Sequence, residues 1–523
     1  MKRRQEPSGR APGPDPRSKT SEWLQAIGII LIAFAGAGWF LFAEHGIAGA
    51  WGYPLDDSWI YATYARNLAT GQGYSFNPGE HVAGATGPLY VFILALLYGL
   101  FHDVVLPAKI LGVLCLAASG VVVFRTVRRV LPGNTISPFL AGALVAGSPP
   151  LLWGSLAGLE ITEYLLLASI GIYFYVREEW TLAVLSWSLG VWLRPDGLLL
   201  ALLGVVLRPR ICLKNSIGPV TVAGVVVGAY LIFNQVVGGS FFPNSVKVAA
   251  HPGGNLLANE WTMLKQFADL WGISPRLGHT GYHAVLLVPA IVVGSILMIR
   301  RWPALVAYLI AFPASLGLYR AWGGQFGRYI VYAVPFGVLL GIVGLERVSR
   351  RALGARFGAG VAVLGVICLC AQVYSARKVG IQYGWNVQNI NGMQRFVAEA
   401  TRRATSPGDT IAVNDVGAIG YFSRCYVVDL VGLVSPTRSF PEALSIYKPK
   451  YMIVFPDWFQ AFATIDWKTG NVVFYDADST YKYSPFLGVR LRRNTISSRN
   501  TMYLYERMAR DEVGVQQVQV VVH

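Results

Sequence analysis

Long apolar runs separated by short basic links constrain this sequence more than any other feature. Between about residue 24 and residue 373 the chain repeats apolar stretches, many of them close to 20 residues long. About 20 apolar residues are enough for a helix to cross the hydrocarbon core of a bilayer. The sequence therefore predicts a polytopic α-helical membrane protein.

The composition agrees with this class. Only 14% of the 523 residues are charged and 54% are hydrophobic, whereas a soluble domain usually carries about 25% charged residues. A net charge of +16 would suggest a nucleic-acid partner if the protein were soluble. Here the basic residues lie mainly in the links between apolar runs, where they orient membrane helices. We therefore expect membrane lipids, and no nucleic acid, as partners.

The arginine clusters set the expected topology. The basic tail before the first run should stay in the cytoplasm, and about 11 crossings then keep every dense cluster on that side. These clusters lie at residues 125–129, 208–214, 300–301 and 347–356. The count treats 181–207 as a hairpin of two short helices, and it treats 89–101 as a helix in the outer interface. The chain is thus expected to be multi-pass in the cell inner (cytoplasmic) membrane, with a cytoplasmic N-terminus and an extracytoplasmic C-terminus.

The pattern changes near residue 376, where apolar runs shorten to strand length. Strands are expected at 410–414, 426–430, 451–455, 472–475 and 501–505, and a helix at 391–404. We therefore expect a small extracytoplasmic α/β domain at 376–523. Before it come a disordered basic tail at 1–20 and a transmembrane domain at 21–375, which carries a long outer loop at 47–88.

Asp56 and Asp57 open the most informative part of that outer loop. Two carboxylates just outside a membrane helix can supply a general base, hold a divalent cation or be solvated loop charges. The helix-compatible residues that follow bring the rings of Trp59, Tyr61 and Tyr64 close to them. Rings beside carboxylates are common in sugar sites, so the pattern favours one of the functional interpretations.

The same loop carries an ordered series of motifs: Asp-Asp, an aromatic residue and Ile, Tyr-Ala-x-Asn-Leu, Gly-x-Gly and Phe-Asn-Pro-Gly-Glu. Its members are Asp56, Asp57, Trp59, Ile60, Tyr64, Ala65, Asn67, Leu68, Gly71, Gly73, Phe76, Asn77, Pro78, Gly79, Glu80, Val82, Gly84 and Thr86. This order resembles the first outer loop of the GT-C superfamily of membrane glycosyltransferases. It is most similar to the branch of mycobacterial terminal arabinofuranosyltransferases and uncharacterised bacterial relatives.

Shorter matches to that branch follow in the same order along most of the chain. They are Gly158-Leu159-Glu160, Arg194-Pro195-Asp196-Gly197, Phe242-Pro243-Asn244-Ser245, Gly323-Gly324 with Arg328, and Asp415 to Tyr421. The resemblance implies a GT-C-like fold. It also implies an inverting glycosyltransferase that moves a sugar from a polyprenyl-phosphate donor to an extracytoplasmic glycan, lipid or protein in cell-envelope biosynthesis. A lipid-linked donor suits that side of the membrane, where nucleotide sugars are not available.

The resemblance also suggests roles for residues. Asp57 is expected to be the base and Asp56 its partner, although the order could be reversed. Arg328, with Lys247 and Arg320 as alternatives, is expected to bind the donor phosphate, because a guanidinium matches phosphate geometry. Further residues expected at the site are Glu160, Arg194, Asp196, Asn244, His81, Trp59 and Tyr64. A divalent cation at Asp56, Asp57 and Glu160 is the one cofactor that these residues suggest.

Ordinary explanations remain for most of these residues. Arg328 can be an interfacial arginine that snorkels, Arg194 can simply pair with Asp196, and Glu160 can be a surface charge. Two other functional classes also remain, a lipid-linked-sugar transporter or flippase and a non-catalytic scaffold for envelope assembly. The sequence leaves open the sugar, the acceptor and the role of the C-terminal domain.

Overall fold

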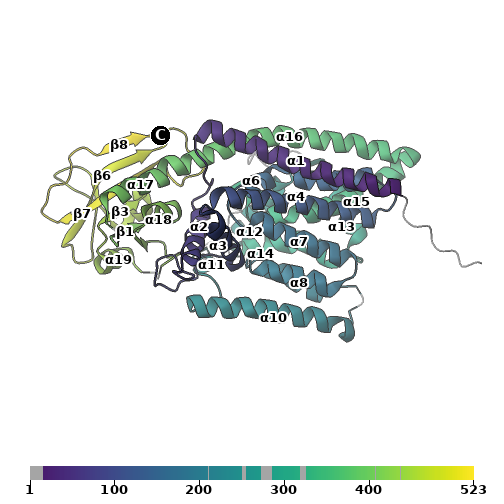
Figure 1. Ribbon diagram of the computed structural model, residues 1–523, viewed down its shortest axis with the longest axis horizontal. Helices are drawn as coiled ribbons and strands as arrows, with labels where there is room; N and C mark the ends of the chain where they lie inside the picture. The colour runs from purple at the N-terminus through teal and green to yellow at the C-terminus, as the bar shows by residue number, and fades with distance from the viewer. Residues whose placement is uncertain are drawn as a thin grey trace, which may run out of the picture.

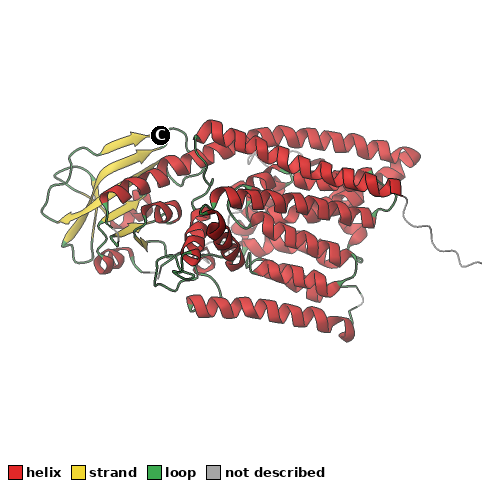
Figure 2. Ribbon diagram, viewed as in Figure 1, coloured by secondary structure: helices red, strands yellow, loops and turns green. Residues whose placement is uncertain are grey.

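A computed structural model describes residues 16–209, 211–249, 255–272, 285–318, 325–406, 408–435 and 438–523. A helical bundle forms one part of the protein, and a domain built on a β-sheet forms the other (Figures 1 and 2). Residues 1–15 of the expected disordered tail lie outside the described part. Helix α1 already begins at Pro16, so the last five residues of that expected tail are helical.

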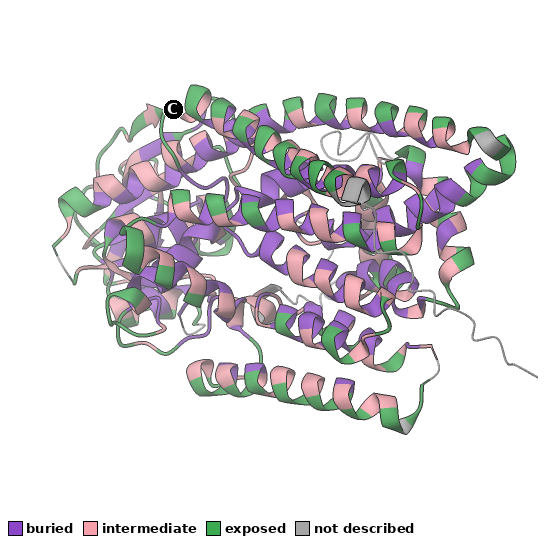
Figure 3. Ribbon diagram, turned by 45° about the vertical axis from the view of Figure 1, so that its right-hand side comes forward, coloured by how far each residue is buried: buried purple, intermediate pink, exposed green. Residues whose placement is uncertain are grey.

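The bundle contains helices whose long axes run roughly parallel in Figure 1. Its helices are α1 (Pro16–Ala48), α4 (Val105–Val130), α5 (Ile136–Ala146), α6 (Pro149–Ser155), α7 (Ile161–Val176), α8 (Trp180–Val191), α9 (Gly197–Val206), α10 (Leu213–Gly238), α13 (Val288–Met298), α14 (Pro303–Gly317), α15 (Val334–Leu353) and α16 (Phe357–Ile390). Buried residues fill the interior of the bundle, whereas the outer helices expose long faces (Figure 3). Those faces carry apolar side chains such as Leu31, Val225 and Val366, as expected for a protein that sits in lipid.

Five helices in the described part are long and apolar enough to cross a membrane by themselves. The pair α5 and α6, bent by 52° between them, adds a sixth if it forms one span. The bend falls at Gly147-Ser148-Pro149-Pro150, and prolines interrupt the hydrogen bonds of a helix. The other expected crossings fall on shorter apolar helices, so the count of about 11 stays a prediction. The chain is a multi-pass membrane protein.

The hairpin expected at 181–207 is present. Helices α8 and α9 pack side by side, and the break between them falls at Arg194-Pro195-Asp196. A Cβ added to Gly197 would lie 3.2 Å from the backbone carbon of Gly190, so the two helices approach closely at the turn. The hairpin brings two charged residues to the end of the bundle that faces the sheet.

Short helices lie between the bundle and the sheet domain. They are α2 (Asp57–Ala69), α3 (Pro88–Phe101) and α11 (Asn244–Ala249), whereas α12 (Leu256–Leu270) packs against α14 of the bundle. In Figure 1, α2 and α3 are packed together at the end of the bundle. One face of α3 exposes Leu96, Leu100 and Phe101, which suits the predicted position in the outer interface.

The sheet domain has the strand order β2-β1-β3-β7-β6-β5-β4, with β8 paired to β6. Strands β1, β2 and β3 are parallel, whereas β7 is antiparallel to both β3 and β6. The strands are β1 (Thr410–Val413), β2 (Tyr426–Asp429), β3 (Tyr451–Val454), β4 (Ala463–Ile465), β5 (Val472–Tyr475), β6 (Tyr481–Arg490), β7 (Thr501–Ala509) and β8 (Gln519–Val522). Its helices include α17 (Phe396–Ala404), α18 (Gly417–Ser423) and α19 (Phe440–Tyr447).

The five expected strands are all present, but β4, β6 and β8 were not expected. Strand β6 carries Lys482, Ser484, Pro485 and Gly488, which weaken its apolar pattern, and its pairing with β7 is irregular near Pro485. Bulges tolerate such residues. The expected helix at 391–404 is the end of a longer helical segment that begins with α16 and continues through a π-helical turn at Asn391–Arg395. The predicted boundary at 375/376 therefore falls inside a helix.

Candidate active site

The start of α2 places Asp56 and Asp57 at the junction between the bundle and the sheet domain. Asp57 is the first residue of α2, and Asp56 precedes it with helical backbone angles. Acidic residues are favourable at a helix N-terminus, where the helix dipole is positive. The Asp56 side chain forms no capping hydrogen bond with its own helix. Both carboxylates instead have partners elsewhere in the protein.

A cavity of about 240 Å³ lies in front of Asp57. Its walls come from α2, from the loop before α3, from the α8–α9 turn, from α11, and from the segments before α7 and α15. They include Asp57, Ile60, Tyr61, Gly84, Ala85, Thr86, Leu159, Glu160, Ile161, Arg194, Pro195, Asp196, Ser245, Val246, Val248, Arg328, Tyr329 and Leu433. Segments far apart in the sequence thus meet around one hollow at the end of the bundle.

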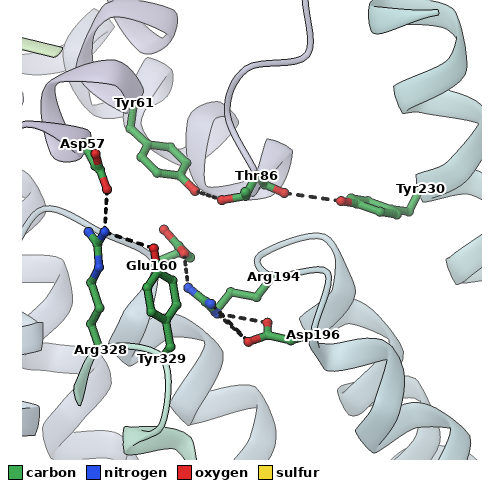
Figure 4. A network of polar contacts seen from close by, with 9 residues as sticks. All are labelled: Asp57, Tyr61, Thr86, Glu160, Arg194, Asp196, Tyr230, Arg328 and Tyr329. Carbon is green, nitrogen blue, oxygen red and sulfur yellow. Dashed lines mark hydrogen bonds and ion pairs between the residues drawn. The ribbon is translucent and has the colours of Figure 1, made fainter. Parts of the chain in front are cut away.

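Arg328 and Asp57 form an ion pair at the wall of this cavity. A guanidinium nitrogen of Arg328 lies 2.7 Å from a carboxylate oxygen of Asp57, and the same nitrogen is 3.0 Å from the hydroxyl of Tyr329 (Figure 4). The Arg328 side chain is 9% exposed, whereas that of Asp57 is 45% exposed. The pair therefore joins a buried cation to a carboxylate that remains open to the cavity.

A second ion-pair group lies beside the first. Arg194 donates to a carboxylate oxygen of Glu160 at 2.8 Å. It also donates to each carboxylate oxygen of Asp196 at 3.0 Å. The three side chains face one another in Figure 4. The Arg194 guanidinium also lies 4.9 Å from the ring centre of Tyr332, a cation–π distance. The mutual pairing expected of Arg194 and Asp196 is present, and Glu160 belongs to the same group.

Asp56 points away from the cavity and into the sheet domain. Its two carboxylate oxygens accept hydrogen bonds from the backbone amides of Gly417 at 2.7 Å and Ala418 at 2.8 Å, at the start of α18. A Cβ at Gly417 would lie 1.9 Å from the Asp56 carbonyl oxygen, so only glycine fits there. Burial and the nearby charge of Asp415 raise the pKa of Asp56, and the two amides oppose this shift.

The sheet domain contributes further groups next to the loop. Asp415 follows β1 and accepts a hydrogen bond from Gln394 at 2.9 Å. Burial and the charge of Asp57 raise the pKa of Asp415 to about 6. Asp429, at the end of β2, accepts from the amides of Val431 and Val434 at 2.8 Å each. These two bonds hold the turn at 429–434, and Leu433 of this turn lines the cavity.

Comparisons with solved structures identify the fold. The crystal structure of ArnT from Cupriavidus metallidurans in the apo state matches over 93% of this chain and 98% of that chain, with a TM-score of 0.57 and 13% identity. The structure of the same protein bound to undecaprenyl phosphate matches with a TM-score of 0.56 and 14% identity over the same shares. The Archaeoglobus fulgidus oligosaccharyltransferase, in complex with Zn and sulfate, matches over 81% of this chain and 67% of that chain, with a TM-score of 0.54 and 13% identity.

The chain has the GT-C fold. The fold class implied by the motifs in the first outer loop is thus confirmed, while membership of the arabinofuranosyltransferase branch stays a prediction. A family model described as a domain of unknown function (DUF8728) matches residues 380–505. That match begins inside α16 and covers most of the sheet domain. No curated protein sequence matches this chain.

Within the GT-C fold, several residues expected at the site lie elsewhere. Trp59 packs against Tyr53, Tyr421 and Phe422, and Tyr64 donates its hydroxyl to the Val82 carbonyl at 2.7 Å. Both rings are buried in the core and neither lines the cavity. Trp59 lies on another face of α2 than Asp57, and Tyr64 lies two helical turns further along.

Other predicted residues also miss the cavity wall or cannot be placed. His81 is an exposed loop residue, and Asn244 contacts the loop before α3 through its backbone amide, 2.9 Å from the Ala83 carbonyl. Arg320 and the side chain of Lys247 lie outside the described residues. Within the described ranges no three His, Cys, Asp or Glu side chains are grouped so that they could hold a metal ion. Asp56, Asp57 and Glu160 accordingly do not form a cluster.

Thr86 and Tyr329 were not expected at the site, and Tyr61 was expected near the carboxylates without being named a site residue. The hydroxyls of Tyr61 and Thr86 lie 2.5 Å apart on one wall, and Tyr329 contacts Arg328. Tyr61 follows Asp57 by four residues, which places both on one helix face, so the helical spacing distinguishes Tyr61 from Trp59. Thr86 belongs to the loop motif, which gave it no role. Nothing in the sequence pattern singles out Tyr329 beyond its position after Arg328.

Proposed function

We propose that this protein is a membrane glycosyltransferase that moves a sugar from a polyprenyl-phosphate-linked donor to an acceptor on the outer face of the membrane, with inversion. The observation that carries the proposal is the ion pair between Asp57 and Arg328 at the wall of the cavity, in a chain with the GT-C fold. One structure with this fold holds undecaprenyl phosphate, which supports a lipid phosphate as the donor group.

Arg328 is proposed to bind the donor phosphate. Its guanidinium is buried, and its Nε has no hydrogen-bond partner among the described residues. A buried donor without a partner is costly, and a phosphate oxygen would satisfy it. Because Arg328 holds Asp57, an arriving phosphate would compete for the guanidinium and release the carboxylate. Donor binding would thereby prepare the base.

Asp57 is proposed to be the general base. Once free of Arg328, its carboxylate can accept the proton of an acceptor hydroxyl while that oxygen attacks the anomeric carbon. The bond between the anomeric carbon and the phosphate oxygen breaks, and its electron pair goes to the phosphate. Arg328 would stabilise the charge that develops there. Attack from the side opposite the phosphate inverts the anomeric centre.

The remaining cavity charges are proposed to position the donor sugar. Arg194 is already neutralised by Glu160 and Asp196, so it is less suited than Arg328 to take a phosphate. The hydroxyls of Tyr61 and Thr86 can donate hydrogen bonds to sugar hydroxyls or accept them, and the carboxylate of Asp196 can accept them. The arginine clusters near 125–129 and 347–356 lie at the opposite end of the bundle. This arrangement supports a cytoplasmic N-terminus and an inner-membrane location with the cavity outside.

The proposal is tested with the full chain in lipid nanodiscs and a panel of radiolabelled polyprenyl-phosphate sugars, supplied with crude envelope glycan. We expect wild type to consume one donor, and Asp57→Asn to be slower by about 10³-fold, since a general base contributes roughly 10²–10⁴. Asp478→Asn is the matched control, because it makes the same chemical change at an exposed turn of the sheet domain.

Each outcome decides between functional classes. Turnover by wild type and Asp478→Asn but not by Asp57→Asn supports the enzyme class and names the sugar. Equal turnover by all three proteins removes Asp57 from the mechanism. If no donor is consumed, donor binding is measured directly: movement of a bound lipid-linked sugar across the bilayer indicates a transporter, and absence of binding indicates a scaffold.

A further inference from the structure

A second cavity, of about 230 Å³, lies at the other end of α2. It is enclosed by the last turns of α2, by the loop that follows and by α18 with the start of β2, and it shares no lining residue with the cavity at Asp57. Arg66, which lines it, follows Asp57 by nine residues, or about 13 Å along a helix axis. The proposed transfer reaction gives this second cavity no role.

Arg66 is a buried cation without an acidic partner. Its side chain is only 7% exposed. It donates to the Tyr421 carbonyl at 2.8 Å and to the Asn67 side chain at 3.3 Å, and no carboxylate within the described ranges pairs with it. Burial and the positive charge of Arg424 lower the pKa of Arg66 to about 10, so it remains charged at neutral pH. A buried charge without a counter-ion is unfavourable.

Arg424 adds a second positive charge to the same cavity. It ends α18 with a φ of +62°, a left-handed conformation that is unfavourable for a residue other than glycine. Its guanidinium is exposed and forms no hydrogen bond or ion pair with a described residue. The structure thus holds two arginines near each other, where their charges repel.

Most other polar side chains around this cavity already have partners. The Asn67 amide donates to the carbonyls of Ser75 and Phe76, and the Asn77 side chain bonds both backbone groups of Val427. The Glu80 carboxylate accepts from Asn77 at 3.0 Å and from the Tyr426 hydroxyl, and it forms no ion pair with either arginine. Gln72, which also lines the cavity, is neutral, so the charge of the lining comes from the two guanidinium groups.

We propose that this second cavity binds an anionic group, a phosphate or a carboxylate, between Arg66 and Arg424. Guanidinium groups form paired, charge-assisted hydrogen bonds with both kinds of anion, and such an anion would neutralise the buried charge of Arg66. The anion can come from a lipid headgroup or from a charged group on a glycan. The site does not depend on the proposed transfer reaction, so its test measures binding and not turnover.

Cys425 provides a reporter for this site, because it lines the same cavity. The full chain in nanodiscs of zwitterionic lipid is treated with N-ethylmaleimide, and the labelling rate of Cys425 is measured by peptide mass spectrometry. We expect inorganic phosphate or glucuronate to slow this labelling if the anion is soluble, and phosphatidylglycerol in the disc to slow it if the anion is a headgroup. A ligand at twice its Kd slows the rate about threefold if only the free site reacts. The exposed Cys212 is the internal control.

Variants connect any protection to the arginines. Arg424→Gln is expected to abolish the effect of the anion on Cys425, whereas Arg402→Gln, which removes the same charge from an exposed position on α17, keeps it. Because Cys425 is half-buried, the melting temperature is measured in parallel, and the anion should stabilise wild type more than Arg424→Gln. Protection that survives Arg424→Gln overturns the proposal. So does the absence of both protection and stabilisation with all three anions.

Discussion

Asp56 and Asp57 are neighbours in the sequence but belong to two different regions of the protein. Asp57 faces the cavity, is 45% exposed and pairs with Arg328. Asp56 faces the sheet domain and accepts two backbone amides of α18. One carboxylate therefore has a partner that a ligand can displace, whereas the other is held by groups that cannot move away without opening the junction.

The first turn of α2 can therefore take part in catalysis through Asp57 and in packing against the sheet domain through Asp56. The Asp57 pair joins two side chains, and the side chain of either can rotate when a phosphate enters. The Asp56 contacts join a side chain to the backbone, and Gly417 has no room for a Cβ against the Asp56 carbonyl. We infer that the sheet domain positions the start of α2 through Asp56, while Asp57 is left free to take part in the chemistry.

The largest effect is expected on the cavity side. Replacing the guanidinium by an amide, as in Arg328→Gln, should lower kcat by about 10²–10³-fold, because a preorganised donor to a developing anion is worth that much. Arg328→Lys keeps the charge but loses the two-pronged geometry of the guanidinium. Its kcat should therefore lie between that of wild type and that of Arg328→Gln. The measurement is the steady-state rate over a range of donor concentrations. A rise in KM with unchanged kcat would mean that Arg328 binds the ground state and the transition state equally.

A smaller effect is expected on the junction side. Asp56→Asn places an amide NH₂ against the backbone amides of Gly417 and Ala418, and it should lower the rate about tenfold by displacing Asp57, since small misplacements are costly in catalysis. Gly417→Ala should act in the same direction through the backbone. Rates are compared with protease sensitivity of the 47–88 loop, which a loosened junction increases. A loss as large as that of Asp57→Asn, with an unchanged cleavage pattern, would show that both carboxylates act in the chemistry.

The smallest effect concerns pH. The pKa of Asp415 is raised to about 6 by burial and by the charge of Asp57, so the folded state favours the protonated carboxyl. Its contribution to stability is present below the unfolded pKa of about 4 and is lost as the pH rises through 6. Asp415→Asn should remove this loss of stability at rising pH and raise the melting temperature at pH 7 by about 2 °C. Melting curves between pH 4 and pH 7 test this; an unchanged slope would mean that Asp415 titrates normally.

Much of the fold could be predicted because it follows from local patterns. The α8–α9 hairpin follows from two apolar stretches interrupted by Arg194-Pro195, and five strands follow from short apolar runs between turns. Strand β6 was missed because Lys482, Ser484, Pro485 and Gly488 interrupt its apolar pattern. Its backbone is satisfied by pairing with β5, β7 and β8, which the local pattern does not show.

The candidate site could be predicted only in part. The motif singled out Asp57, Arg194 and Arg328, which line the cavity, but it also suggested Trp59 and Tyr64, which are core residues. Rings on α2 share the face of Asp57 only at helical spacings such as four or seven residues. Tyr61 lies one turn from Asp57 and lines the cavity, whereas Tyr64 lies two turns away and is buried in the core.

The sequence by itself determined the class of protein, the sequence of apolar helices and the loop that carries the carboxylates, since hydrophobic length and periodicity act locally. Only the tertiary structure decided which carboxylate faces the cavity and which is held by α18, and that Arg66 and Arg424 share a second hollow. These facts depend on contacts between residues more than 350 positions apart. Such contacts exist only after the sheet domain has packed against the end of the bundle, because that packing alone brings their side chains together.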